Sequence, residues 1–270
     1  MKFFCLIILL FSTLQTFSAE IECLKVSDST TDLLHCKTKL KNYPELVHFY
    51  IPKHLDLKLP LQLFTHFHGH NLKGYDHFSK TYGDYGLFLL KSKANAVLVI
   101  PESHGHCETY DKFFSDKKRA IQFYSEVESV IERKTLMNIT TVALSGHSGA
   151  YRVLNRLIGY ANSEDETFSK ISALGLFDAT YGVIPEIEKW VKNKSDSNEH
   201  FLFYDTFVSG NMATTEENSL ILKKHFQNLT LENIFFIPVS GHDAESLLDQ
   251  HFNILKRGSL TRFWTKASAL

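Results

Sequence analysis

The chain alternates between short apolar runs and longer segments in which apolar residues recur every three or four positions. Leu61–Phe67 and Ala96–Ile100 are compact apolar runs that end near glycine or proline, as strands buried on both faces do. Residues 120–133 place Tyr124, Val127 and Ile131 on one side, which predicts an amphipathic helix. Further strands are predicted at 139–144, 171–177, 201–208 and 234–239, and further helices near 151–158, 184–191, 218–226 and 244–255.

This alternation of strands and helices predicts an α/β fold with a mainly parallel, doubly wound sheet covered by helices on both faces. Residues 21–52 alternate apolar and polar positions and predict short strands before the first parallel one. The length of 270 residues suits one α/β domain, and no repeat or Pro/Gly-rich linker divides the chain. We predict a single domain over residues 20–270.

Residues 1–19 have the features of a cleavable export signal. Lys2 supplies a basic start, Phe3–Phe11 is apolar, and Ser18 and Ala19 are small residues suited to cleavage. The apolar run is too short for a permanent membrane anchor. We therefore expect a secreted or periplasmic protein without stable membrane insertion. The formal net charge of −1 provides no basic field for nucleic acid.

Three cysteines remain after removal of the signal: Cys23, Cys36 and Cys107. In an oxidising compartment, Cys23 and Cys36 are candidates for a disulfide across an N-terminal hairpin. Three buried free thiols are the alternative.

The strongest local motif is Gly146-His147-Ser148-Gly149-Ala150, which lies between a predicted strand and a predicted helix. A serine in this context lies on a strained turn that exposes its hydroxyl, and small residues two positions before and after prevent collisions. The Gly149 amide begins the following helix, whose dipole favours negative charge. We predict that Ser148 is a nucleophile and that Gly149 donates to an oxyanion.

This motif, with the polar residues that follow later strands, resembles the α/β-hydrolase superfamily over nearly the whole mature chain. The last position of the motif is Ala150 rather than glycine, and alanine is small enough for the turn. The resemblance implies a serine hydrolase without a cofactor that cleaves a carboxylic ester, or an amide, through an acyl-enzyme. The implied substrate is a small-molecule or polymer-linked acyl compound.

In this family the nucleophile is followed by an acid and then a histidine. His242 lies between the last predicted strand and helix, where the family carries its base. Asp178 directly follows the strand 171–177 and is the preferred acid. Asp205, inside the next strand, is the alternative acid.

The turn His68-Gly69-His70-Asn71 follows the strand Leu61–Phe67 and resembles the family's oxyanion turn. Gly69 or His70 would supply the second amide donor. Three residues close to the catalytic candidates in sequence are candidates for substrate binding: Tyr151, Arg152 and Tyr181.

Two other classes of protein fit parts of the sequence. His66, His68 and His70 alternate along the chain and are a candidate zinc cluster, which would make the protein a metal-dependent hydrolase. The metallo-β-lactamase superfamily has an Asp-His pair at the end of its first motif, and His70-Asn71 stands there in this chain, so no metal is expected. The third class is a non-catalytic binding protein on the same fold.

Overall fold

The structure is a computed structural model in which nine strands form one sheet among the described residues, in the order β1-β2-β3-β5-β4-β6-β7-β8-β9. The strands are β1 Glu22–Leu24, β2 Leu33–Lys39, β3 Leu46–Pro52, β4 Leu61–Phe67, β5 Ala96–Pro101, β6 Ile139–His147, β7 Ile171–Phe177, β8 Leu202–Val208 and β9 Ile234–Val239. The described residues are 22–24, 32–70, 85–163, 165–182, 184–210, 214–229, 232–240, 250–251 and 253–270.

The sheet is parallel from β5 through β4, β6, β7 and β8 to β9, whereas β1, β2 and β3 pair antiparallel, and β3 is antiparallel to β5. The predicted mainly parallel sheet is confirmed. The chain passes from β4 outward to β5 and then crosses back over β4 to β6. The connections that leave β4 and β6 therefore diverge, and the crevice at their carboxyl ends is where open α/β sheets bind ligands.

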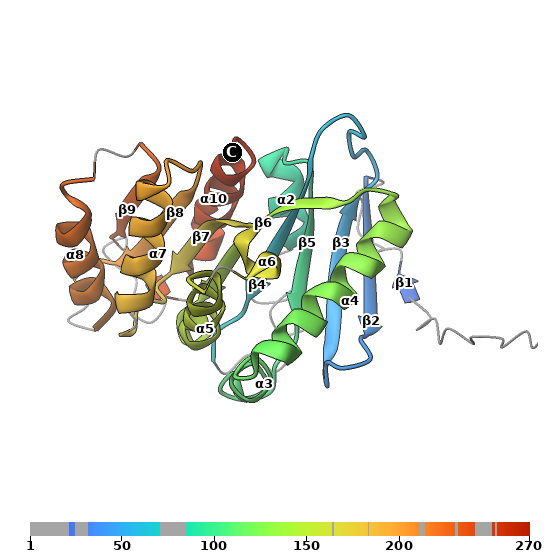
Figure 1. The fold of residues 1–270 in the computed structure, drawn as a ribbon, viewed down its shortest axis with the longest axis horizontal. Helices are drawn as coiled ribbons and strands as arrows, with labels where there is room; N and C mark the ends of the chain where they lie inside the picture. Colours follow the sequence, from blue (N-terminus) through green and yellow to red (C-terminus); the bar gives the residue numbers. More distant parts are fainter. Residues whose placement is uncertain are drawn as a thin grey trace, which may run out of the picture.

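Helices cover both faces of this sheet (Figure 1). One face packs against α3 Glu108–Phe113, α4 Lys117–Thr135, α5 Tyr151–Ala161, α6 Glu166–Ser169, α7 Ile184–Asp196 and α8 Thr214–Phe226. The other face packs against α2 Tyr85–Ser92 and α10 Leu260–Ala267.

The two layers explain the apolar runs in the sequence. Every residue of β4, β5 and β8 is buried, because each strand has a helix layer on both of its faces. The helices show the amphipathic pattern instead, and α4 buries Phe123, Val127 and Ile131 among others. The Asp116 carboxylate caps α4 by accepting from the Lys118 amide at 2.8 Å.

The observed elements differ from the prediction mainly at the shorter helices. The sequence pattern did not predict α2 or α3, because six to eight residues are too few for a clear helical period. The helix predicted at 244–255 falls largely outside the described residues. The C-terminal helix that is described, α10, lies further along the chain and buries Phe263 and Trp264.

Two other predictions concern the N-terminal region. The export signal at residues 1–19 lies outside the described residues. The β1–β2 register places Cys23 opposite Cys36, and Cys36 is disulfide-bonded. The Cys23 side chain is not described, so the Cys23–Cys36 bridge stays a prediction. In the part of the chain that is described, no helix is both long enough and apolar enough to cross a membrane.

Candidate active site

Ser148 lies at the sharp turn between β6 and α5. It has a φ of +51°, and the turn residues Ser148–Ala150 form a short 3₁₀ segment that continues directly into α5. A left-handed backbone at a residue with a Cβ costs about 1–2 kcal/mol, so it persists only where its surroundings enforce it. The strand-turn-helix context expected for a serine nucleophile is therefore present.

The packing around this turn explains why it contains glycine. A Cβ added to Gly146 would lie 2.8 Å from the Ala150 Cβ, and one added to Gly149 would lie 2.2 Å from Nδ1 of His70. A Cβ on Gly69 would lie 2.8 Å from the Ser148 Cβ. The turn that contains Gly69 and His70 therefore packs directly on the Ser148–Gly149 backbone, and larger side chains would separate the two turns.

Asp178 immediately follows β7, with a φ of +46°. Its carboxylate is 1% exposed and accepts a hydrogen bond from Nδ1 of His251. Burial alone would raise the pKa of this carboxyl, but the hydrogen bond and the charge of His251 outweigh burial, so the pKa is lowered. Asp178 is an ionised carboxylate that orients a histidine.

The sequence did not single out His251 among the 14 histidines. It is not at the end of a predicted strand, and no glycine turn precedes it, so no local signal marks it. The predicted base, His242, lies in the segment 241–249, outside the described residues.

His147, the residue before Ser148, links β6 to His251. Its Nε2 donates to the His251 carbonyl oxygen at 3.0 Å, and the two imidazole rings lie 4.5 Å apart between centroids. Burial, and then the neighbouring His251, lower the pKa of His147 to about 3. His147 is therefore neutral at neutral pH and supports the position of His251 without competing for its proton.

Asp205 lies inside β8 opposite Leu176 and is fully buried. Its carboxyl oxygen accepts from the Thr180 hydroxyl at 3.1 Å. Burial raises the pKa of Asp205 to about 7, against weaker opposing effects of the Ser219 and Thr180 hydroxyls. A carboxyl whose pKa is raised to near neutral pH is only partly ionised there, and it is poorly suited to stabilise an imidazolium.

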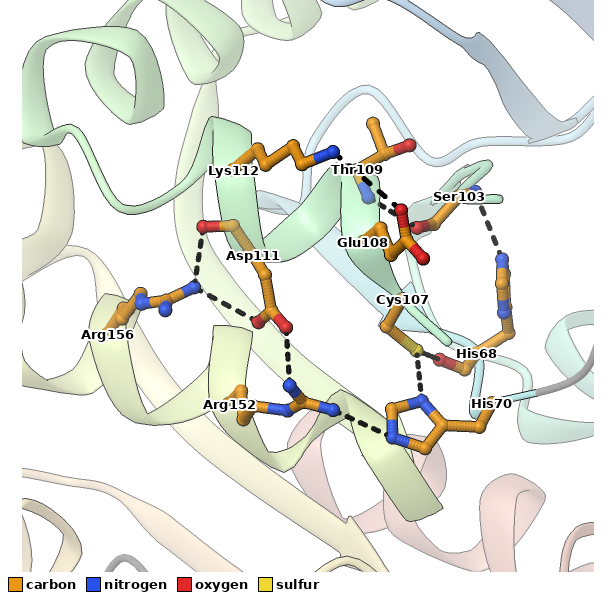
Figure 2. A network of polar contacts seen from close by, with 10 residues as sticks. All are labelled: His68, His70, Ser103, Cys107, Glu108, Thr109, Asp111, Lys112, Arg152 and Arg156. Carbon is orange, nitrogen blue, oxygen red and sulfur yellow. Dashed lines mark hydrogen bonds and ion pairs between the residues drawn. The ribbon is translucent and has the colours of Figure 1, made fainter. Parts of the chain in front are cut away.

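The three alternating histidines of the candidate metal cluster have separate partners. Nδ1 of His66 lies 2.9 Å from the Ser145 hydroxyl. The His68 ring contacts the Gly69 carbonyl. Figure 2 shows its contact with the Ser103 amide and the contacts of the His70 ring with Cys107 and Arg152. Among the described residues, no three His, Cys, Asp or Glu side chains converge as a metal site would require.

The candidate substrate-binding residues lie at the same edge of the sheet. Burial, followed by the Asp178 charge, raises the pKa of Tyr181 to about 12, and the neighbouring Ser148 side chain opposes this rise. The Tyr181 and Tyr151 rings lie 5.6 Å apart between centroids. Arg152 is not simply solvated, because it binds Asp111 at 2.7 Å and Nε2 of His70 at 2.8 Å.

Solved structures with the same architecture are numerous. A feruloyl esterase module from Clostridium thermocellum is 12% identical and has a TM-score of 0.56, with 92% of this chain and 96% of that one covered. The α/β-hydrolase fold is thus established for this chain.

Two further structures with this fold have similar scores. A dienelactone hydrolase-like promiscuous phosphotriesterase from metagenomic libraries is 9% identical, with a TM-score of 0.52 and coverage of 86% and 98%. A ferulic acid esterase from Anaeromyces mucronatus is 15% identical, with a TM-score of 0.51 and coverage of 89% and 93%. No protein-family model and no curated protein matches the chain. Function must therefore be argued from the site.

Proposed function

We propose that this α/β-hydrolase-fold protein is a serine hydrolase that cleaves a carboxylic ester, with Ser148 as nucleophile and Asp178 as the orienting acid. The observation that carries the proposal is the left-handed Ser148 turn at the end of β6, beside the Asp178–His251 pair at the end of β7. The solved structures cited above include two esterases, and they favour an ester over an amide as the scissile bond.

In the proposed reaction, a histidine accepts the Ser148 proton while Oγ attacks the carbonyl carbon. The tetrahedral oxyanion accepts hydrogen bonds from the Gly149 amide and from the Gly69–His70 turn. The imidazolium then protonates the leaving alcohol, and an acyl-Ser148 ester remains. Water, activated by the same histidine, attacks this ester and releases the carboxylic acid.

His251 is the best supported base, because Asp178 already binds its Nδ1. An aspartate in this position holds the imidazole in the tautomer that presents Nε2 to the nucleophile. His242 is the base that its place in the sequence predicts. Because the two residues lie on one short segment of the chain, separate substitutions distinguish them.

The remaining parts of the proposal concern the substrate and its location. Tyr151, Arg152 and Tyr181 are proposed to line the path of a small-molecule or polymer-linked acyl substrate. We also propose export of the mature chain after removal of residues 1–19. The disulfide-bonded state of Cys36 supports an oxidising compartment.

Labelling with a fluorophosphonate tests the central claim without knowledge of the substrate. The wild-type protein should form one adduct, mapped to the Ser148 peptide by mass spectrometry, and should hydrolyse simple aryl esters. Ser148→Ala should lose both properties while its circular dichroism is unchanged, and EDTA should leave the wild-type rate intact. An unlabelled wild-type protein, or an Ser148→Ala variant with more than a few per cent of the wild-type rate, would refute the assignment.

A further inference from the structure

The His70 ring belongs to a hydrogen-bonded chain that runs from Asp111 to the turn before Gly69 (Figure 2). Asp111 binds the Arg152 guanidinium at 2.7 Å, and Arg152 contacts Nε2 of His70 at 2.8 Å. Nδ1 of His70 contacts Cys107 Sγ at 3.3 Å, and Sγ contacts the His68 carbonyl oxygen at 3.4 Å. These contacts tie two segments, α5 and the stretch formed by Cys107 and α3, to the proposed oxyanion turn.

Because Arg152 can only donate, the direction of every hydrogen bond in this series is determined. Arginine only donates, so Nε2 of His70 must accept and the ring proton must be on Nδ1. Nδ1–H then donates to Cys107 Sγ, and the thiol donates its own proton to the carbonyl oxygen of His68. Burial raises the pKa of Cys107 to about 12, so the thiol keeps the proton that this last bond needs.

The loop between β5 and α3 is shaped to present this thiol. Cys107 has a φ of +64°, a left-handed conformation that is unfavourable for a residue with a Cβ. The same loop also holds the neighbouring imidazole, because the Ser103 amide donates to Nε2 of His68 at 3.1 Å. Nδ1–H of His68 therefore donates to the Gly69 carbonyl at 2.8 Å, and the turn is bound on both sides.

The position of the His70 ring matters because it lies directly on Gly149, where an added Cβ would be 2.2 Å from Nδ1. The two amides of the proposed oxyanion hole belong to these two contacting segments. We propose that Arg152 and Cys107 are positioning residues that hold the oxyanion turn in place through the His70 ring. This inference rests on the proposed serine hydrolase function and gives Arg152 a positioning role in addition to its place along the proposed substrate path.

These hydrogen bonds also predict how protonation of His70 affects the site. A second proton on Nε2 would remove the acceptor for Arg152 and place two cations in contact. Burial, then the charges of Arg152 and His106, lower the pKa of His70, whereas Asp111 raises it. Cys107 faces the other ring nitrogen as a neutral thiol. Removal of the Arg152 charge should therefore raise the pKa of His70.

Matched substitutions on α5 test the proposal. Arg156 also binds Asp111, at 3.1 Å, but the structure gives it no contact with His70, so Arg156→Gln controls for loss of charge and of the Asp111 ion pair. We expect Arg152→Gln and Cys107→Ala to lower kcat for a neutral aryl ester about 10- to 100-fold with KM within about twofold. Arg156→Gln should remain within about twofold, and Cys107→Ser should keep more activity than Cys107→Ala. Rates are normalised to sites titrated with a phosphonate, and melting temperatures are compared.

Nitrogen NMR of the full-length protein labelled at histidine gives a readout that does not depend on turnover. The His70 signals, assigned by their loss in His70→Asn, should show the proton on Nδ1, and Arg152→Gln should raise the pKa of His70. An Nε2–H tautomer, or unchanged kcat in Arg152→Gln, would overturn the proposal. So would a loss confined to KM for an anionic ester, which would make Arg152 a substrate anchor. If the wild-type protein takes no phosphonate label, the proposed serine hydrolase function is wrong. The His70 tautomer still tests the hydrogen bonds that join Arg152, His70 and Cys107.

Discussion

Asp178 and Asp205 belong to neighbouring parallel strands, the first directly after β7 and the second within β8, and both are fully buried, yet their pKa values shift in opposite directions. Asp178 stands one residue beyond β7, where a left-handed backbone brings its carboxylate to His251. Asp205 stands inside β8, where its carboxyl accepts a hydrogen bond from the Thr180 hydroxyl. Burial acts to raise the pKa of both carboxyls, but the hydrogen bond from His251 lowers that of Asp178, whereas the pKa of Asp205 rises to about 7.

The comparison shows that burial alone does not decide the role of a carboxyl. A strand end opens toward side chains of other segments, and a histidine can reach it there. Asp205, inside the sheet, is enclosed by neighbours that supply hydroxyl donors, and its one charged influence among the described residues is the like charge of Asp178. Ionisation, and with it the capacity to stabilise an imidazolium, follows from this difference in partners.

The largest expected effect concerns the histidine that Asp178 orients. His251→Gln should lower kcat for an aryl ester by about 10⁵- to 10⁶-fold, because without a base the Ser148 hydroxyl is a poor nucleophile. His242→Gln should stay within about tenfold of the wild-type rate. The kcat of both variants is measured, and unchanged circular dichroism shows that each is folded. The reverse outcome would identify His242 as the base and give the Asp178–His251 pair a structural role.

The next effect separates the two aspartates directly. Asp178→Asn should lower kcat by about 10⁴-fold, because the amide no longer selects the productive histidine tautomer. Asp205→Asn should keep kcat within about threefold, since its carboxyl binds the Thr180 hydroxyl, whereas His251 binds Asp178. Rates are normalised to phosphonate-titrated sites. A dead Asp205→Asn with an active Asp178→Asn would place the acid on β8.

A third prediction uses the pH dependence of stability. The Asp205 pKa is raised from 3.8 in the unfolded chain to about 7 in the folded protein, so the folded state binds more protons between these values. Its contribution is fully present below about pH 4 and is lost as pH rises through about 7, by at most about 4 kcal/mol. Asp178 has the opposite sign, because its lowered pKa gives stability that is lost in acid.

Urea unfolding of wild type and Asp205→Asn from pH 4 to pH 8 checks this prediction. The free energy of unfolding of the variant relative to wild type should rise with pH over that range. A difference that is constant with pH would mean that Asp205 is ionised in the folded protein throughout.

The smallest expected effect concerns the Thr180 hydroxyl, which donates a hydrogen bond to Asp205. Thr180→Val removes the 3.1 Å hydrogen bond to the Asp205 carboxyl and should cost about 1 kcal/mol of stability at neutral pH. The kcat should remain within about threefold, because the Thr180 side chain donates to Asp205 rather than to Asp178 or Ser148. Thermal unfolding and aryl ester turnover are measured together. A kcat loss larger than that of Asp178→Asn would contradict the separation of the two carboxyls.

The sequence alone predicted the parts of the site that depend on local order. Residues 139–158 contain an apolar strand, a glycine-flanked serine and an amphipathic helix in succession. The Ser148 turn is therefore predictable from one segment of about twenty residues. Asp178 was identified in the same way, from its place after an apolar run. The parallel sheet followed from the repeated alternation of such units.

The tertiary structure decided which distant groups meet. His251 reaches Asp178 across 73 positions of the chain, and Arg152 reaches His70 across 82. Neither pair has a local pattern, because both depend on how the C-terminal segment and α5 pack against the sheet. The sequence by itself determined the strands, the turns and the residue types at their ends, since these depend on neighbours along the chain. Only packing decided which imidazole accepts which proton, because that depends on atoms brought together by the fold.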